Sequence, residues 1–204
     1  MTYIPDNKIE QKSFELLSKY SGNFNWQLAF PIPIEMIIEN QIGYSLDTFF
    51  EEDNILGAID QVNKIIYTNE NATKYFNSYP GSFEFTLAHE VGHWDLHCDY
   101  DANQLYITDK QVSMICRAGD SNFKEIQANK YAAAILMPSI LVKETLANID
   151  YCNWSTLYNL AENWHVSISA LKTRLETLNL LYCDTKTKTL YKNKALANGQ
   201  QRLF

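Results

Sequence analysis

Apolar residues recur at helical spacing over the first part of the chain. A helix is expected within residues 7–20, where hydrophobic positions repeat every three or four residues and Gly22 follows as a stop. Pro33 suits the first turn of a second, short helix through Ile38. Gly43 would end that helix.

The pattern then changes from helical spacing to short apolar runs. Residues 55–60 and 63–68 are typical of two strands of a small sheet. A longer helix follows, which Ser82 would cap and which runs to His97 with apolar residues on its buried side. Residues 98–119 contain several turn-forming residues, and we expect them to be irregular.

Helices dominate the second half of the chain. A strong helix is expected from about Asn122 to Met137, where Pro138 stops it. Two further helices with a short turn between them are expected over residues 155–178. Ser167 would cap the second of these helices.

The end of the chain and the order of its elements complete the fold prediction. Asn179 suits the left-handed position after a helix, and the tail around Asp184 is typical of a short hairpin. The predicted fold class is α+β. A mostly helical domain with a small sheet is expected at residues 1–150, and a small helix-turn-helix-like module with a C-terminal hairpin at residues 151–204.

Composition and charge narrow the class of protein. Apolar residues make up 46% of the 204 residues, which is enough to fill a core, and the net charge is −7. An acidic chain repels phosphate backbones, so direct nucleic-acid binding is not expected. The sequence offers neither a signal peptide nor an apolar run of about 18 residues, which favours a cytoplasmic protein without a membrane partner. The four cysteines are widely spaced, and we expect free thiols.

The sequence His89-Glu90-Val91-Gly92-His93 is an H-E-x-x-H motif on a predicted helix. Residues four apart lie about 40° apart around a helix axis, so both imidazoles can bind one ion. Glu90 lies beside His89 and could reach a water molecule on that ion without binding the ion itself. Zinc lowers the pKa of such a water to about 7, and Glu90 would act as the general base.

A catalytic zinc takes three protein ligands and keeps one open position, so a third ligand is needed. Glu125 is the best candidate, because its helix contains small residues such as Ala128 that permit close approach of a neighbouring helix. Asn129 faces the same way and could accept the spare N–H of a zinc-bound histidine. The alternative is that Glu125 is a solvated glutamate in the first turn of its helix.

His97 is the rival third ligand. His89, His93 and His97 would be spread over about 12 Å of one helix, too far to converge on one tetrahedral ion. Gly92 has a separate explanation. A glycine inside a helix costs about 1 kcal/mol relative to alanine, so we expect a close neighbour behind the motif.

Two long segments carry a family resemblance. Residues 85–97, Phe-Thr-Leu-Ala-His-Glu-Val-Gly-His-Trp-Asp-Leu-His, resemble the F-T-L-A-H-E-x-G-H segment of the ImmA/IrrE family of bacterial metallopeptidases. Residues 125–138, Glu-Ile-Gln-Ala-Asn-Lys-Tyr-Ala-Ala-Ala-Ile-Leu-Met-Pro, are similar to its E-x-x-A-N-x-F-A-A-x-L-L-M-P segment. The strand pair at residues 57–59 and 65–69 is a weaker match to the same family.

The resemblance implies a function and a set of site residues. It implies one zinc ion per chain with His89, His93 and Glu125 as ligands, and Glu90 as the catalytic base. Many relatives cleave a helix-turn-helix repressor of a phage, mobile element or stress regulon, so a repressor is the implied substrate and partner. Glu84 departs from the family pattern, because many relatives carry a basic residue there.

Two functional hypotheses therefore compete. The first is a zinc-dependent endopeptidase. The second is a non-catalytic, zinc-stabilised regulatory protein that contacts DNA through residues 155–178. The presence of Glu90 favours the enzyme, because a purely structural zinc site has no use for a general base and is usually closed by four protein ligands.

Overall fold

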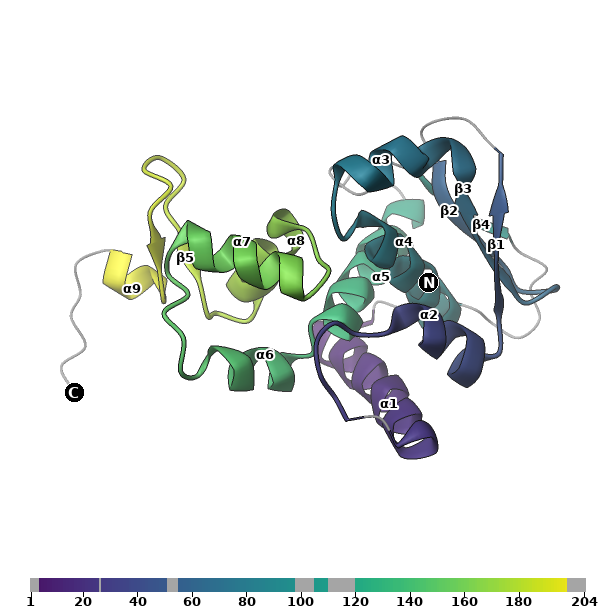
Figure 1. The fold of residues 1–204 in the computed structure, drawn as a ribbon, viewed down its shortest axis with the longest axis horizontal. Helices are drawn as coiled ribbons and strands as arrows, with labels where there is room; N and C mark the ends of the chain where they lie inside the picture. Colours follow the sequence, from purple (N-terminus) through teal and green to yellow (C-terminus); the bar gives the residue numbers. More distant parts are fainter. Residues whose placement is uncertain (1–3, 26, 51–54, 98–104, 110–119, 198–204) are drawn as a thin grey trace.

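The protein is an α+β structure in which helices pack against one face of a small sheet. A computed structural model describes residues 4–25, 27–50, 55–97, 105–109 and 120–197. Figure 1 shows the sheet at one end, two long helices beside it in the middle, and the C-terminal helices and hairpin at the other end. The α+β prediction is confirmed. Within the described residues, no helix is both long and apolar enough to cross a bilayer.

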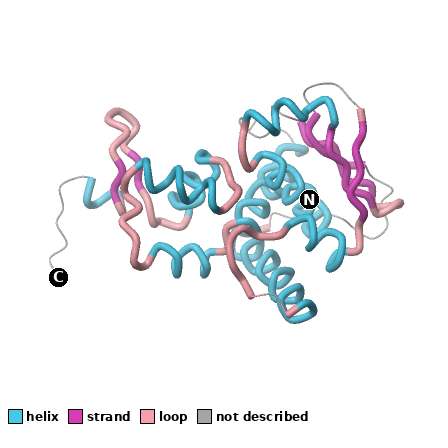
Figure 2. The backbone as a smooth tube through the Cα atoms, viewed as in Figure 1, coloured by secondary structure: helices cyan, strands magenta, loops and turns pink. Residues whose placement is uncertain are grey.

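Helices form most of the described chain (Figure 2). Their bounds are α1 Asp6–Phe24, α2 Ile34–Met36, the π-helical turn η1 Ile37–Ile42, the 3₁₀ turn η2 Glu70–Ala72, α3 Thr73–Ser78, α4 Ser82–His97, α5 Asp120–Leu136, α6 Ser139–Leu146, α7 Trp154–Asn163, α8 Ile168–Thr177 and α9 Lys194–Ala197. The strands are β1 Ser45–Phe49, β2 Ile55–Asp60, β3 Ile65–Asn69, β4 Leu105–Asp109, β5 Tyr182–Cys183 and β6 Leu190–Tyr191.

The first helix continues beyond its predicted stop. Gly22 lies inside α1, and the helix ends at Phe24 with Asn25 in the left-handed conformation at φ 51°. Asparagine tolerates that conformation better than most residues, so it replaces glycine as the terminator here. The second predicted stop is right: Gly43 ends η1 with a φ of 77°.

The sheet has the strand order β1-β3-β2-β4. The two expected strands, β2 and β3, pair with each other in antiparallel direction, and β1 lies parallel to β3. Residues 105–109 were expected to be irregular but form β4, which pairs antiparallel with β2 across a bulge between Ile55 and Gly57. These residues form a strand because they pair with a segment that is distant in sequence, and local composition does not reveal such a partner.

Helix α4 packs between the sheet and α5, and this packing places the H-E-x-x-H motif in the centre of the fold. An ideal Cβ built on Gly92 would lie 3.0 Å from both the Cα and the carbonyl oxygen of Ala128 on α5. The predicted close neighbour behind Gly92 is therefore confirmed. The predicted cap is wrong: Ser82 is the first residue of the helix, and its buried hydroxyl has no hydrogen-bond partner among the residues that the structure describes.

The C-terminal elements follow the predicted order. Ser167 caps α8 by accepting a hydrogen bond from the amide of Ala170, and Asn179 is left-handed at φ 56°. The predicted hairpin is present as β5 and β6. Cys152 and Cys183 are free thiols, as expected, whereas Cys98 and Cys116 lie outside the described residues.

Polar and aromatic contacts connect α7 and α8 to the N-terminal part of the chain. Arg174 on α8 is buried, and its guanidinium binds both carboxylate oxygens of Glu10 on α1 and the carbonyl oxygen of Met137. The ring of Trp164 stacks on Phe30 with 3.9 Å between centroids. The division of the chain near residue 150 stays a prediction.

Candidate metal centre

Helix α4 carries three buried polar side chains, of which two are adjacent in sequence and the third lies one turn later. His89 is 1% exposed, and Glu90 and His93 are fully buried. Buried polar groups are costly unless they are paired or bind a ligand. The helical period places both histidine rings on the side of α4 that faces α5, because they lie four residues apart.

Helix α5 supplies the third group of the cluster. The Nε2 atoms of His89 and His93 lie 2.9 Å apart. One carboxylate oxygen of Glu125 lies 3.1 Å from Nε2 of His89, and the other lies 3.2 Å from Nε2 of His93. A tetrahedral ion with bonds of about 2.1 Å separates its ligands by about 3.4 Å, close to these spacings. The three residues could therefore hold a metal ion, and all their ligand atoms lie within 4.8 Å of one another.

Asn129 orients the first histidine. Its side-chain oxygen lies 2.9 Å from Nδ1 of His89, so the ring donates its Nδ1–H to this amide. That hydrogen bond leaves the Nε2 lone pair of His89 directed at the shared point of the cluster. The sequence-based expectation for Asn129 is confirmed, and it depends on the same α4–α5 contact that brings Glu125 into place.

The electrostatics of the cluster favour a bound cation. Burial raises the pKa of Glu125, but hydrogen bonds from His89 and His93 outweigh that effect and lower the pKa to about 2. Burial also lowers the pKa of His89, yet the hydrogen bond to Glu125 and the charges of Glu90 and Glu125 raise it overall. Burial lowers the pKa of His93, which stays neutral. A site in which the partly buried Glu125 is ionised and the neighbouring Glu90 is fully buried suits a positive charge.

His97 faces a different partner. Its Nε2 lies 3.0 Å from the side-chain oxygen of Gln127, whose amide in turn lies 3.4 Å from the carbonyl oxygen of Ile4. Burial lowers the pKa of His97 to about 3, and the nearby charges of His93 and Lys124 act in the same direction. Among the described residues, the group that could hold a metal ion comprises His89, His93 and Glu125 without His97.

Strand β2 packs against Glu90 through a position that the sequence pattern does not single out for this role. A Cβ on Gly57 would lie 3.3 Å from Oε1 of Glu90, 2.7 Å from Cγ2 of Thr86 and 3.2 Å from the carbonyl oxygen of Tyr67. Any side chain here would collide with α4 or displace the carboxylate. Gly57 is therefore the residue that allows the sheet to approach the motif closely, and a glycine inside a strand was the only signal for it.

Comparison with known proteins agrees with this geometry. The model of the IrrE N-terminal-like domain, peptidase M78, matches residues 48–176. The chain belongs to this family. The matched part begins in β1 and ends in α8, so it contains β2, α4 and α5 with His89, His93 and Glu125, and also Glu90. The family resemblance noted in the sequence is confirmed.

The family match indicates a general activity and covers only part of the chain. It indicates a peptidase of the metal-dependent kind, in agreement with the histidine and carboxylate group. It ends before the β5–β6 hairpin and begins after α1, so neither the hairpin nor Glu10 belongs to the matched part. Among curated proteins, no sequence matches this chain.

Proposed function

We propose that this protein is a zinc-dependent endopeptidase that hydrolyses a peptide bond in a protein substrate. The observation that carries the proposal is the convergence of His89, His93 and Glu125 within hydrogen-bonding distance of one another, with the buried Glu90 next to them on the same helix. Two histidines and one glutamate form a donor set of catalytic zinc sites, which keep one position open for water or substrate. One zinc ion per chain is expected.

Each side chain of the cluster has a proposed task. A bound zinc ion would supply Lewis acidity and lower the pKa of water in its open position to about 7. Glu90 takes the proton of the attacking water and passes it to the leaving amine nitrogen. Asn129 keeps His89 in the tautomer whose Nε2 is free to bind metal. Gly57 leaves the space that the Glu90 carboxylate occupies.

The substrate proposal rests on the family resemblance. Many relatives in the family cleave helix-turn-helix repressors, so the proposed substrate is a repressor of a phage, mobile element or stress regulon. The proposed setting is the cytoplasm, where such repressors act. A role in transcription regulation and the stress response follows from cleavage of the repressor.

A DNA-binding role for α7 and α8 is not favoured. These two helices, with their short turn, form the proposed helix-turn-helix-like module. Arg174 on the second helix is 3% exposed and bound to Glu10, and Lys172 is paired with Glu176 at 2.8 Å. Both basic side chains of that helix therefore already have acidic partners within the protein, and DNA binding needs free ones.

The decisive experiment compares the protein with its Glu90→Gln variant. Both would be loaded with zinc and incubated with a helix-turn-helix repressor encoded beside its gene, and with denatured casein as a general substrate. New N-termini would be identified by mass spectrometry. Because glutamine keeps the size of glutamate but cannot accept the proton, we expect cleavage to fall by at least about 100-fold.

Zinc content provides the control. Elemental analysis should give about one zinc per chain for both proteins, because Glu90 does not bind the ion. Equal cleavage by both proteins would refute the role of Glu90. Zinc binding without cleavage of either substrate by the parent would favour the non-catalytic alternative. Cleavage of casein but not of the repressor would refute only the substrate proposal.

A further inference from the structure

A hollow of about 490 Å³ lies far from the metal centre, between α8 and the β5–β6 hairpin. Three lysines line it, and each comes from a different element: Lys172 from α8, Lys188 from the hairpin loop and Lys194 from the start of α9. Asn179 and Asn193 add amide groups to the wall. A concave site of this volume is within the size range of pockets for small ligands.

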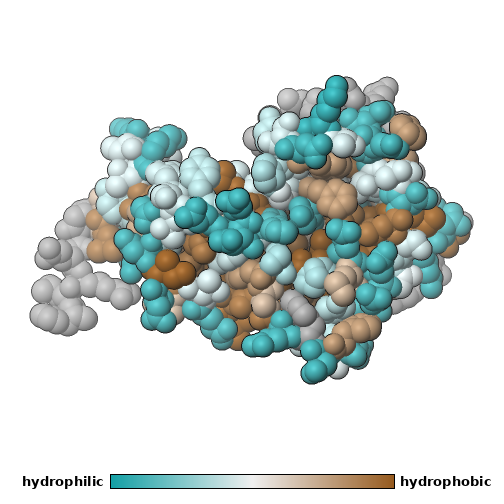
Figure 3. Space-filling view, in the orientation of Figure 1, coloured by the Kyte–Doolittle hydropathy of each residue, from teal (hydrophilic) through white to brown (hydrophobic). Residues whose placement is uncertain are grey.

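The charge around this hollow is opposite to that of the whole protein. The chain has a net charge of −7, yet residues 182–194 contain four lysines and one acidic residue, Asp184. The Asp184 carboxylate accepts hydrogen bonds from the amides of Lys186 and Thr187, so it serves to shape the loop. In Figure 3 the surface of this end of the molecule is largely hydrophilic. The lysines are thus concentrated where they can act together.

The hairpin loop holds its lysine in a fixed place. The backbone of Lys188 is left-handed at φ 59°, its amide donates to the carbonyl of Asp184, and its carbonyl accepts from the indole of Trp154 at 2.9 Å. Lys172 is paired with Glu176. Among the described residues, no close ion pair involves Lys188 or Lys194, although the charge of Lys188 contributes to the lowered pKa of Asp184. An anion in the hollow could therefore contact both ammonium groups.

We propose that this hollow binds a phosphate-bearing small molecule of the nucleoside polyphosphate class. Lysine ammonium groups are common phosphate ligands, and a polyphosphate offers enough charge to contact several of them at once. The partly exposed ring of Tyr182, which also lines the hollow, provides a surface for a base. Nucleic acid carries the same phosphate chemistry, but it needs a broad basic surface, and the other basic side chain of α8, Arg174, is buried.

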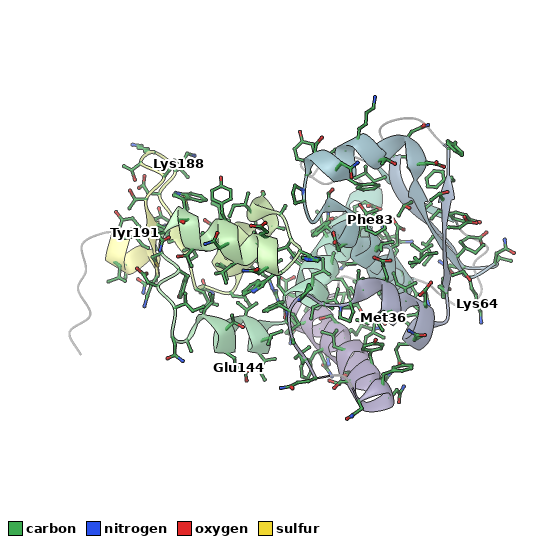
Figure 4. The ribbon with its side chains drawn as sticks, in the orientation of Figure 1. Met36, Lys64, Phe83, Glu144, Lys188 and Tyr191 are labelled. Carbon is green, nitrogen blue, oxygen red and sulfur yellow. The ribbon has the colours of Figure 1, made fainter. Side chains whose placement is uncertain are left out.

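The test measures binding of Mg-ATP to the zinc-loaded, full-length protein by calorimetry at about 0.15 M salt. The variant combines Lys188→Gln with Lys194→Gln. The matched control is Lys64→Gln, because Lys64 is also left-handed, at φ 56°. Lys64 lies at the far end of the sheet from Lys188 in Figure 4. A parallel arm titrates a 20-base-pair DNA duplex, and elemental analysis checks that zinc remains bound.

The double variant loses two hydrogen bonds to charged groups, so we expect it to bind Mg-ATP at least about tenfold more weakly. The Lys64→Gln protein should bind like the parent. No binding of Mg-ATP at about 10 mM would overturn the proposal, and so would equal binding by the double variant. Tighter binding of the duplex than of Mg-ATP through the same lysines would assign the surface to nucleic acid and overturn the small-molecule proposal. These outcomes do not depend on whether the protein is a peptidase.

Discussion

Gly92 on α4 packs directly against the backbone of α5, and its replacement by alanine tests whether this contact sets the geometry of the metal centre. The new Cβ would lie 3.0 Å from the Cα and the carbonyl oxygen of Ala128 and 3.1 Å from the Cβ of Tyr131. These atoms belong to or adjoin the backbone of α5, so no side-chain rotation can make room. The two helices must separate by a few tenths of an ångström.

The expected free energy combines two opposing effects. Alanine is a better helix former than glycine by about 1 kcal/mol, which favours the variant. Overpacking of a tight interior contact costs about 1–3 kcal/mol. We therefore expect Gly92→Ala to change the free energy of unfolding by between zero and a loss of about 2 kcal/mol. Glu125 lies one turn before Ala128 on α5, so its carboxylate moves away from both histidines and zinc affinity falls.

Gly22→Ala is the matched control. Gly22 is also helical, on α1, but a Cβ there would meet nothing within 4 Å. The same change should therefore raise the free energy of unfolding by about 0.5–1 kcal/mol and leave zinc affinity unaltered. Chemical denaturation of the metal-free proteins measures stability without a contribution from ligand binding. Competition with a chelator measures zinc affinity.

A Gly92→Ala protein that gained as much stability over the parent as Gly22→Ala, and bound zinc as tightly as the parent, would refute the proposed role of this contact. That result would mean that α4 and α5 are less closely packed than their contact distances indicate. A loss of stability without a loss of zinc affinity would separate the two claims. The contact would then be real, but the position of Glu125 would not depend on it.

Three further predictions concern the same region. Glu125→Ala should reduce zinc binding strongly, while His97→Ala should keep it near normal. If elemental analysis found less zinc in His97→Ala than in Glu125→Ala, Glu125 would be rejected as the third ligand in favour of His97. Gly57→Ala should lower the free energy of unfolding, measured by denaturant titration, by about 1–3 kcal/mol. Adding Thr86→Ser removes the methyl group with which the new Cβ collides, so the double variant should recover part of that loss. The pKa of His97 is lowered from 6.5 to about 3 in the folded protein. Between these pH values the unfolded chain therefore binds a proton at His97 that the folded chain does not bind. The metal-free protein should lose stability as pH falls from 6.5 towards 3. His97→Gln should show a smaller loss over this range, and an unchanged pH profile would contradict the assignment.

The centre of the site could be predicted because its information is local. The i, i+4 spacing places His89 and His93 on one face of a helix whatever the rest of the chain does. The same spacing places Asn129 beside Glu125 on the second helix. The mid-helix Gly92 and the small residues of α5 indicated that two helices approach closely there. Each of these expectations needed only helical periodicity and residue size.

The features that the sequence did not reveal depend on contacts between distant segments. Strand β4 forms because residues 105–109 pair with β2, about 50 residues earlier in the chain. The approach of Gly57 to Glu90 depends on how the sheet packs against α4, which no local pattern encodes. The burial of Arg174 depends on Glu10, 164 residues away. From its residue type alone, Arg174 would be expected to be an exposed basic side chain on a DNA-binding helix.

Local signals also misplaced two helix ends. Gly22 was an expected stop, yet it lies in the last turns of α1, and Asn25 takes the left-handed position. Ser82 was an expected cap, yet the helix already includes it, and the carbonyl of Gly81 accepts a hydrogen bond from the amide of Phe85. Terminators and caps are interchangeable within a few residues, so composition fixes the existence of a helix better than its ends.

The most direct test of the metal centre is a crystal structure of the zinc-loaded protein with anomalous diffraction measured at the zinc absorption edge. We expect one anomalous peak per chain, about 2.0–2.1 Å from Nε2 of His89 and of His93 and about 2.0–2.2 Å from a carboxylate oxygen of Glu125. Glu90 should lie beside the peak without contacting it. The account is contradicted if the peak is absent from this cluster, or if His97 closes on the metal while Glu125 points to solvent.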